Sequence, residues 1–342
     1  MTPVDPHHPV AVASGASRPD SGVSLDDALN RLVSLQDGDR GVLDAVACGR
    51  DAIAPLRTLL FRREPSGLFQ PRCHVVEALA ALGARDVLRE FVLSDRDIAD
   101  PVEAAGEDAV LNAAVRALHG EADETFVQRL LVLACTRRLA APIEALGALR
   151  HPGALACLLA ALADDVARPA AEGAIRHYGR AARTLLLAAV TERDVRDGAE
   201  TESSRRRRRA ALALLLETGD AADLSREQRD LWVHDDDPQI VVAGCRLVLA
   251  CGDPAERGAA IGRLLDMLPF VDWKLRSEMV DCLEDNRGDA RPLIRALVAS
   301  FAPDAADFSP PAEAQRYLIR LAHRLDEHGG IVSLGVVEER CS

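Results

Sequence analysis

The chain has 342 residues, 48% of them apolar, whereas a single hydrophobic core stops growing near roughly 250–300 residues. The length therefore argues against one ordinary globular core and for two domains or a repeat array. A net charge of −13 and a pI near 5.2 argue against a general phosphate-backbone binder, which needs basic residues. Aromatic residues make up only 3% while Ala and Leu dominate, and this composition predicts an all-α protein of helices packed on helices.

The N-terminal residues 1–23 are rich in Pro, Asp, Ser and Gly and contain neither a basic nor an apolar block, so we expect a disordered leader rather than a signal peptide. No segment approaches the roughly 18 uninterrupted apolar residues of a membrane span. The eight cysteines form no C-x-x-C motif, and all but Cys341 lie in apolar helical stretches, which indicates buried, reduced thiols of a cytoplasmic protein. Lys274 is the only lysine, and this preference for arginine suggests a GC-rich bacterial gene.

Helices of two kinds alternate along the chain. Residues 51–60 and 289–298 each open with an Asp that could cap a helix and place a Pro in the first turns. Residues 71–83 and 237–250 instead have Pro at or before the first helical position, followed by apolar residues at three- and four-residue spacing. Pairing a first helix with a second helix throughout predicts 25–36 with 40–48, 51–62 with 71–83, 86–94 with 107–118, 121–134 with 137–148, 151–162 with 165–177, 179–190 with 204–216, 224–233 with 238–250, 254–268 with 272–284, and 289–301 with 311–327.

These residues resemble the HEAT-repeat family, in particular the short bacterial form also found in phycobilisome-lyase-like repeats. The best matches are Asp237-Pro238 with Val241-Val242, and the segment Glu77-Ala-Leu-Ala-Ala-Leu-Gly83. The resemblance covers roughly residues 25–327 and implies a right-handed α-solenoid of about nine helical pairs over residues 24–327. The repeat specifies a fold and no particular function.

The connections and the C-terminal end complete the predicted organisation. Residues 95–106 and 191–203 are acidic and lack apolar periodicity, so they are predicted to be long loops. Helix 311–327 is polar and is predicted to cap the array, with a tail over 328–342. Within that tail, residues 331–337 could form a short strand or remain irregular.

Enzyme motifs are absent from the chain. There is no G-x-x-x-x-G-K-[ST], no G-x-S-x-G and no H-E-x-x-H. The HEAT-like deoxyhypusine hydroxylases bind iron through His-Glu dipeptides, and this sequence has none; His74 with Glu77 is the nearest approach and is interpreted as a solvated polar pair. The acidic run His234 to Asp237 is interpreted as a helix cap rather than a metal site, so we expect neither metal nor cofactor.

The arginine run Arg205 to Arg209 is the most conspicuous feature of the sequence. Such a run is most often a solvated face or a counterweight to acidic neighbours, although charged blocks also bind partners. The four central second helices nevertheless carry a formal charge of +7, which predicts a basic concave groove suited to an acidic peptide. Reversing the charges of Arg206, Arg207 and Arg208 together should then weaken partner binding and leave the thermal melt nearly unchanged. The predicted groove residues are Arg72, His74, Arg116, Arg176, His177, Arg205, Arg206, Arg207, Arg208, Arg209 and Arg246.

Trp232 and Trp273 raise an alternative, because HEAT-like DNA glycosylases hold DNA with tryptophans and an Asp. Those proteins are basic and richer in aromatics, so both tryptophans are interpreted as core residues. The favoured function is a non-catalytic, cytoplasmic protein-interaction scaffold of unspecified oligomeric state. The alternatives are a glycosylase-like nucleic-acid enzyme, and a lyase or chaperone of the phycobilisome-lyase type.

Overall fold

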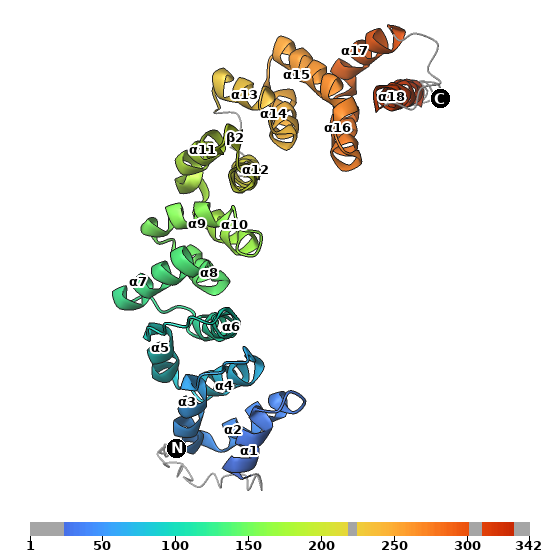
Figure 1. Ribbon diagram of the computed structural model, residues 1–342. Helices are drawn as coiled ribbons and strands as arrows, with labels where there is room; N and C mark the ends of the chain where they lie inside the picture. The colour runs from blue at the N-terminus through green and yellow to red at the C-terminus, as the bar shows by residue number, and fades with distance from the viewer. Residues whose placement is uncertain (1–23, 218–223, 301–309, 332–342) are drawn as a thin grey trace, which may run out of the picture. The chain divides into compact units, whose positions relative to one another are not determined.

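The described part of the chain is almost entirely helical. The computed structural model describes residues 24–217, 224–300 and 310–331, and these contain eighteen α-helices and one two-stranded hairpin (Figure 1). The prediction of an all-α protein is therefore confirmed. By its internal packing the chain divides into two compact units, Met1–Glu121 and Ala122–Ser342.

The first unit consists of three helical pairs. In each pair the two helices pack on one another: α1 on α2, α3 on α4, and α5 on α6. The second helices also pack on each other in sequence, α4 on α2 and α6 on α4, while α3 contacts α5. The unit is thus two-layered. Its elements are α1 (Leu25–Leu32), α2 (Gly38–Ala47), the 3-10 turn η1 (Gly49–Ala52), α3 (Ile53–Phe61), α4 (Gln70–Ala81), α5 (Arg85–Leu93) and α6 (Pro101–Ala117).

The second unit continues the same alternation. Helices α8, α10, α12, α14 and α16 pack each on the next, and α9 contacts α11. Its elements are α7 (Glu124–Val132), the π-helical turn η2 (Leu133–Arg137), α8 (Ala140–Leu149), η3 (Pro152–Ala154), α9 (Leu155–Ala161), α10 (Arg168–Arg176), η4 (Gly179–Ala182), α11 (Arg183–Thr191), β1 (Val195–Arg196), β2 (Ala199–Glu200), α12 (Glu202–Glu217), α13 (Arg226–Val233), α14 (Pro238–Cys251), α15 (Pro254–Met267), η6 (Leu268–Phe270), α16 (Trp273–Asp285), α17 (Arg287–Ala299) and α18 (Pro310–Ile331).

Five helices of the described segments, α6, α7, α14, α15 and α16, begin after an aspartate whose side chain accepts from N–H groups of the first turn. Asp237 accepts hydrogen bonds from the backbone N–H groups of Gln239 and Ile240, which confirms its predicted capping role. Asp51 and Asp289 do not cap: Asp51 lies inside η1, and Asp289 is ion-paired with Arg257 at 2.7 Å. For these two helices, the Asp followed by Pro predicted the presence of the helix correctly but not the residue at which it begins.

Both predicted long loops are shorter than expected. Helix α6 begins at Pro101 because Asp100 accepts from the N–H groups of Val102 and Glu103, so the prediction of a loop to residue 106 is wrong. Residues 195–200 form a hairpin in which Asp197 and Gly198 both have positive φ, 52° and 80°. An Asp-Gly turn of this kind matches the twist of the flanking strands.

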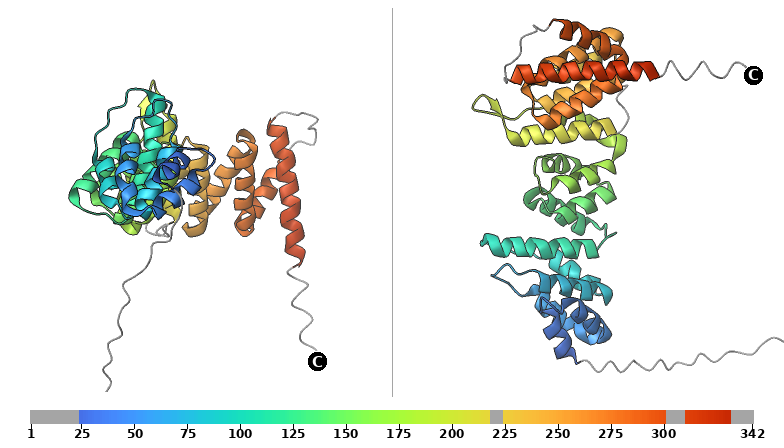
Figure 2. Two further views of the ribbon diagram at one scale, coloured as in Figure 1. Left: turned by 90° about the horizontal axis from the view of Figure 1, so that it is seen from below. Right: turned by 90° about the vertical axis from the view of Figure 1, so that its right-hand side faces the viewer.

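The C-terminal end of the second unit is closed by α18. Its Leu318, Leu321 and Leu325, spaced along one face, are buried in a core shared with α14 to α17. Each buried leucine contributes about 1.5–3 kcal/mol. Figures 1 and 2 show α18 beside α16 and α17. The helix ends at Ile331, four residues beyond the predicted boundary. The predicted leader 1–23 and the tail residues 332–342 lie outside the described residues.

The burial of the cysteines and the hydropathy of the helices were also predicted from the sequence. Of the cysteines in the described segments, only Cys245 and Cys282 are buried; Cys48, Cys73 and Cys157 are half-buried, and Cys135 and Cys251 are exposed. The prediction that they are all buried is wrong, because several lie on the solvent side of amphipathic helices. Over the three described segments, no helix combines the length and hydropathy needed to cross a bilayer.

Candidate functional site: an arginine network and an inner-helix groove

The arginine run lies on the first turns of α12, and neighbouring carboxylates hold its side chains. Arg206 pairs with Asp165 at 2.5 Å, Arg207 with Asp194 at 3.1 Å, and Arg209 with Asp237 at 2.6 Å. Arg205 has a looser contact with Glu202 at 3.9 Å. The run therefore acts as the counterweight to acidic neighbours that the sequence favoured, and most of its charge is neutralised within the protein.

Arg208 is the buried centre of this network, with only 1% of its surface exposed. Its Nε donates to the carbonyl oxygen of Val190, near the end of α11, at 2.7 Å, and its two terminal nitrogens pair with Glu200 and Asp235. The guanidinium thereby satisfies a carbonyl that the end of a helix leaves without a partner. Arg208 connects α11, the hairpin and the turn before α14.

The carboxylate of Asp235 is held ionised by the same network. Burial by itself raises the pKa of Asp235, but the N–H of Asp237 and the guanidinium of Arg208 outweigh it and leave the pKa below its ordinary value. Arg193 adds a further ion pair to Asp235 at 2.8 Å. Since Asp235 and Asp237 of the acidic run pair with arginines, this run forms structural contacts.

Arg72 performs the same task in the first unit. Its Nε donates to the carbonyl oxygen of Leu60, near the end of α3, at 3.0 Å, and it pairs with the buried Glu107 at 2.6 Å. Arg276 repeats the contact on α16 by donating to the carbonyl oxygen of Leu268 at 3.1 Å. The placement of Arg208 in an accessible groove is therefore wrong, because it is buried where α12 joins α11. Arg72 is 7% exposed where α4 joins α3 and lines a hollow of about 190 Å³.

The remaining predicted residues lie at or near the surface. His74 is half-buried on α4, with Nε2 3.6 Å from Asp39, while its expected partner Glu77 is exposed. Arg116 is exposed on α6, and Arg176 and His177 are exposed at the end of α10. Arg176 pairs with Glu217 at 2.7 Å, and this hydrogen bond lowers the pKa of Glu217.

Arg246 differs from the run. It is exposed on α14 and donates to the carbonyl oxygen of Glu278 at 3.1 Å, but within the described segments it forms no ion pair. Its guanidinium stands at one side of a groove of about 520 Å³ between α12 and α14. Its apolar lining consists of Leu212, Ala213, Leu216, Ile240, Val242 and Ala243, and its charged lining consists of Arg209, Glu217, Arg246 and Glu278. Of the predicted groove residues, Arg209 from the arginine run and Arg246 from α14 therefore line the same groove.

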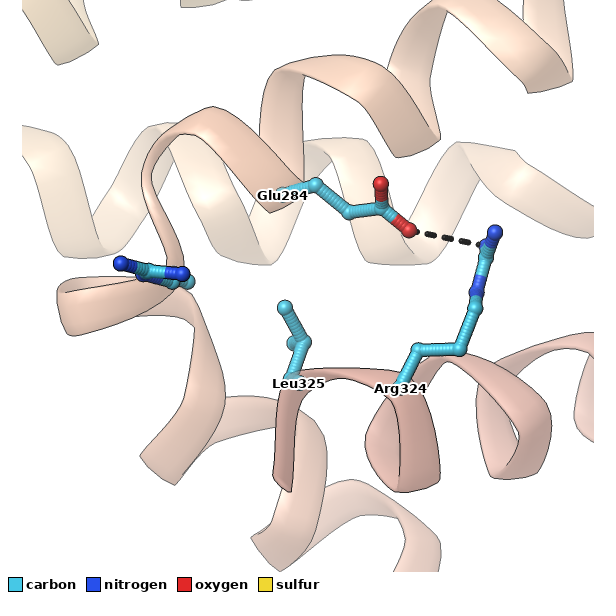
Figure 3. Close-up of a pocket in the computed structure, with 4 residues that line it drawn as sticks. Glu284, Arg324 and Leu325 are labelled. Carbon is cyan, nitrogen blue, oxygen red and sulfur yellow. Dashed lines mark ion pairs between the residues drawn. The ribbon is translucent and has the colours of Figure 1, made fainter. Parts of the chain in front are cut away.

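A second hollow lies near the C-terminal end, between α16 and α18. It has a volume of about 330 Å³ and is lined by Glu284, Arg287, Arg324 and Leu325. In Figure 3 a dashed line marks the ion pair between Glu284 and Arg324, which is 2.9 Å long. Its lining holds one carboxylate and two guanidinium groups, and one of these guanidinium groups is already paired with that carboxylate.

The two tryptophans differ in their environment. Trp232 is buried with 3% of its surface exposed, packed where Gly244 lets α14 approach α13, which confirms its core role. Trp273, the first residue of α16, is 80% exposed, so the assignment of Trp273 to the core is wrong. Phe270 in the preceding turn η6 is also 80% exposed. The first residue of a helix has no preceding turn to cover it, and hydropathy alone did not reveal this.

No group of three or more His, Cys, Asp or Glu side chains in the described segments is arranged to hold a metal ion. In comparisons with known proteins, no family model, no curated protein and no solved structure matches this chain.

Proposed function

We propose that this chain is a non-catalytic protein-interaction scaffold, a HEAT-like α-solenoid whose second helices present a groove to a segment of a partner protein. The observation that carries the proposal is the groove between α12 and α14, whose lining combines apolar side chains with the exposed guanidinium of Arg246. Apolar area supplies affinity, and a charge-assisted contact at the edge fixes the orientation of what is bound.

The solenoid arrangement is supported by the packing order inside each unit. Second helices follow one another, α2, α4 and α6 in one unit and α8 to α16 in the other. Repeated packing of this kind is how helical repeats bury faces that no single pair could bury alone. A right-handed superhelix of nine such pairs is the arrangement that the HEAT resemblance implies.

The partner segment we propose is an acidic peptide with apolar side chains. The arginine run contributes little to its recognition, since Arg206, Arg207 and Arg209 are already paired with Asp165, Asp194 and Asp237. Arg246 is the guanidinium of this groove that still offers N–H donors to a carboxylate of the peptide. Two carboxylates, Glu217 and Glu278, also line the groove, and Glu217 is paired with Arg176. The positive charge that the groove offers a ligand is therefore limited to Arg246.

The test uses peptides selected on the intact protein. A phage-displayed library of random twelve-residue peptides is panned against the wild-type chain, and the enriched peptides are measured by fluorescence anisotropy. We expect peptides that combine Asp or Glu with apolar residues, and a roughly 10- to 100-fold weaker affinity for Arg246→Glu, since a hydrogen bond to a charged group contributes about 1.5–3 kcal/mol.

The matched control is Arg196→Glu, the same charge change on the exposed hairpin strand β1, which should leave affinity unchanged. Equal binding to the wild type and Arg246→Glu, or no enrichment of acidic peptides, would contradict the proposal. Duplex DNA added at low salt should not displace the peptides; displacement would instead favour the nucleic-acid alternative.

A further inference from the structure

Two cysteine thiols meet on neighbouring helices of the second unit. Cys135 lies in η2 and is exposed, whereas Cys157 lies on α9 and is half-buried. Turn η2 packs on α9, and the two side chains are hydrogen-bonded to each other. They come from successive helical pairs, so the contact joins parts of the chain that the sequence separates.

The backbone around Cys135 departs from regular helix. Residues 133–137 form a π-helical turn, which ends at Arg138 in the left-handed region with φ 53° and ψ 39°. A residue other than glycine in this region is strained, and π turns are frequent at functional sites. The turn places Cys135 on the surface at the end of α7.

No other cysteine of the described segments combines access with a neighbouring thiol. Cys245 and Cys282 influence each other electrostatically, but both are buried. Cys251 is exposed, and its Sγ donates to the carbonyl oxygen of Leu247 at 3.1 Å. The pair Cys135 and Cys157 is therefore distinct within the described part of the chain.

We propose that Cys135 and Cys157 form a reversible disulfide, made by exchange with a low-molecular-weight disulfide such as oxidised glutathione. The Cys135 thiolate attacks one sulfur of the small disulfide, which forms a mixed disulfide and releases one thiolate. The Cys157 thiol then loses its proton and attacks Sγ of Cys135, which releases the second thiolate. Two protein thiols are oxidised, one small disulfide is reduced to two thiols, and the two protons pass to the released thiolates.

The two cysteines take different roles in this reaction because they differ in exposure to solvent. Cys135 is the more exposed of the two cysteines and reacts first, while Cys157 is half-buried and reacts second. Burial, together with the hydrogen bond to Cys135, raises the pKa of Cys157 to about 12, so Cys157 is a poor first nucleophile at neutral pH. Formation of the mixed disulfide removes the thiol proton of Cys135 and places its sulfur next to Cys157.

The consequence is a covalent link between η2 and α9. The disulfide requires about 2.05 Å between the sulfur atoms, and the hydrogen bond between the two thiols places these atoms side by side. A cross-link that closes a loop of this length should raise the melting temperature of the second unit by about 6–12 °C. The bond would stiffen the junction between successive pairs in an oxidising medium.

The test is peptide mapping of the intact wild-type protein after treatment with oxidised glutathione and trypsin, without reduction. The two cysteines lie on different tryptic peptides, residues 130–137 and 151–176, so an internal disulfide gives one cross-linked species that dithiothreitol separates. We expect this species together with the rise in melting temperature. Persistent glutathionylation of Cys135 without the cross-link would overturn the proposal, as would a lack of reaction at both cysteines.

Two variants distinguish the disulfide from a general effect of the oxidant. Cys157→Ser should stop the reaction at the mixed disulfide on Cys135 and abolish the rise in melting temperature. Cys251→Ser removes an exposed cysteine without a thiol neighbour and should form the cross-link like the wild type. If Cys157→Ser does not fold, the mapping of the wild type still decides between the outcomes.

Discussion

Replacing Arg208 with alanine should destabilise the protein far more than the same change at Arg206, two residues earlier in one arginine run. Arg208 is 1% exposed and connects the Val190 carbonyl with Glu200 and Asp235. Removing one partner of a buried ion pair typically costs 3–5 kcal/mol. Here Asp235 keeps Arg193, so we expect about 3–4 kcal/mol and a fall in melting temperature of about 10 °C.

The control change, Arg206→Ala, removes an ion pair whose Asp165 partner is 60% exposed, and exposed pairs contribute below about 1 kcal/mol. Both variants are compared with the wild type by urea unfolding of the full chain, followed through its helical circular dichroism. If the two variants differ by less than about 1 kcal/mol, Arg208 is not a structural centre and the run is a uniform solvated face. A large loss at Arg208 would also contradict the expectation that reversing Arg206, Arg207 and Arg208 leaves the melt unchanged.

Two further predictions concern titration and packing. The folded-state pKa of Asp235 lies below its ordinary value, so its ionisation contributes stability above about pH 4 that is lost as pH falls through the folded-state pKa. The difference in unfolding free energy between the wild type and Arg208→Ala, measured with urea, should therefore narrow between pH 5 and pH 3. A difference that does not change with pH would contradict this. Trp232→Ala should lower the free energy of unfolding by about 3–5 kcal/mol because the ring is buried. Trp273→Ala, on an 80% exposed side chain, should change it by less than about 0.5 kcal/mol. Equal losses would show that Trp273 has a packing role.

The order and type of the helices could be predicted from the sequence because they depend on local chemistry. Apolar residues at three- and four-residue spacing, proline near helix starts and capping aspartates act within a few turns, so each predicted pair has a counterpart in the structure. Even the overlooked start of α6 had a local signal, Asp100 followed by Pro101, of the same kind as Asp237 followed by Pro238. The Asp197-Gly198 turn was likewise visible as a hairpin signal within a segment predicted to be a loop.

The candidate sites depended on neighbours distant in the sequence. Five consecutive arginines are chemically alike, but the fold buries Arg208 among the ends of other elements and leaves Arg205 near the surface. A formal charge summed along one helix does not include Asp165, Asp194 or Asp237, which reach the run from other segments.

The sequence by itself determined an all-helical chain of paired amphipathic helices, because helix formation is governed by periodicity and capping that lie within one segment. Only the tertiary structure decided which charges remain available, because an ion pair forms wherever two side chains meet in space. It therefore separated Arg246, exposed beside a groove, from the neutralised arginine run, and it brought Cys135 and Cys157 together from two helical pairs. No periodic pattern in the sequence indicates which of these distant side chains come into contact.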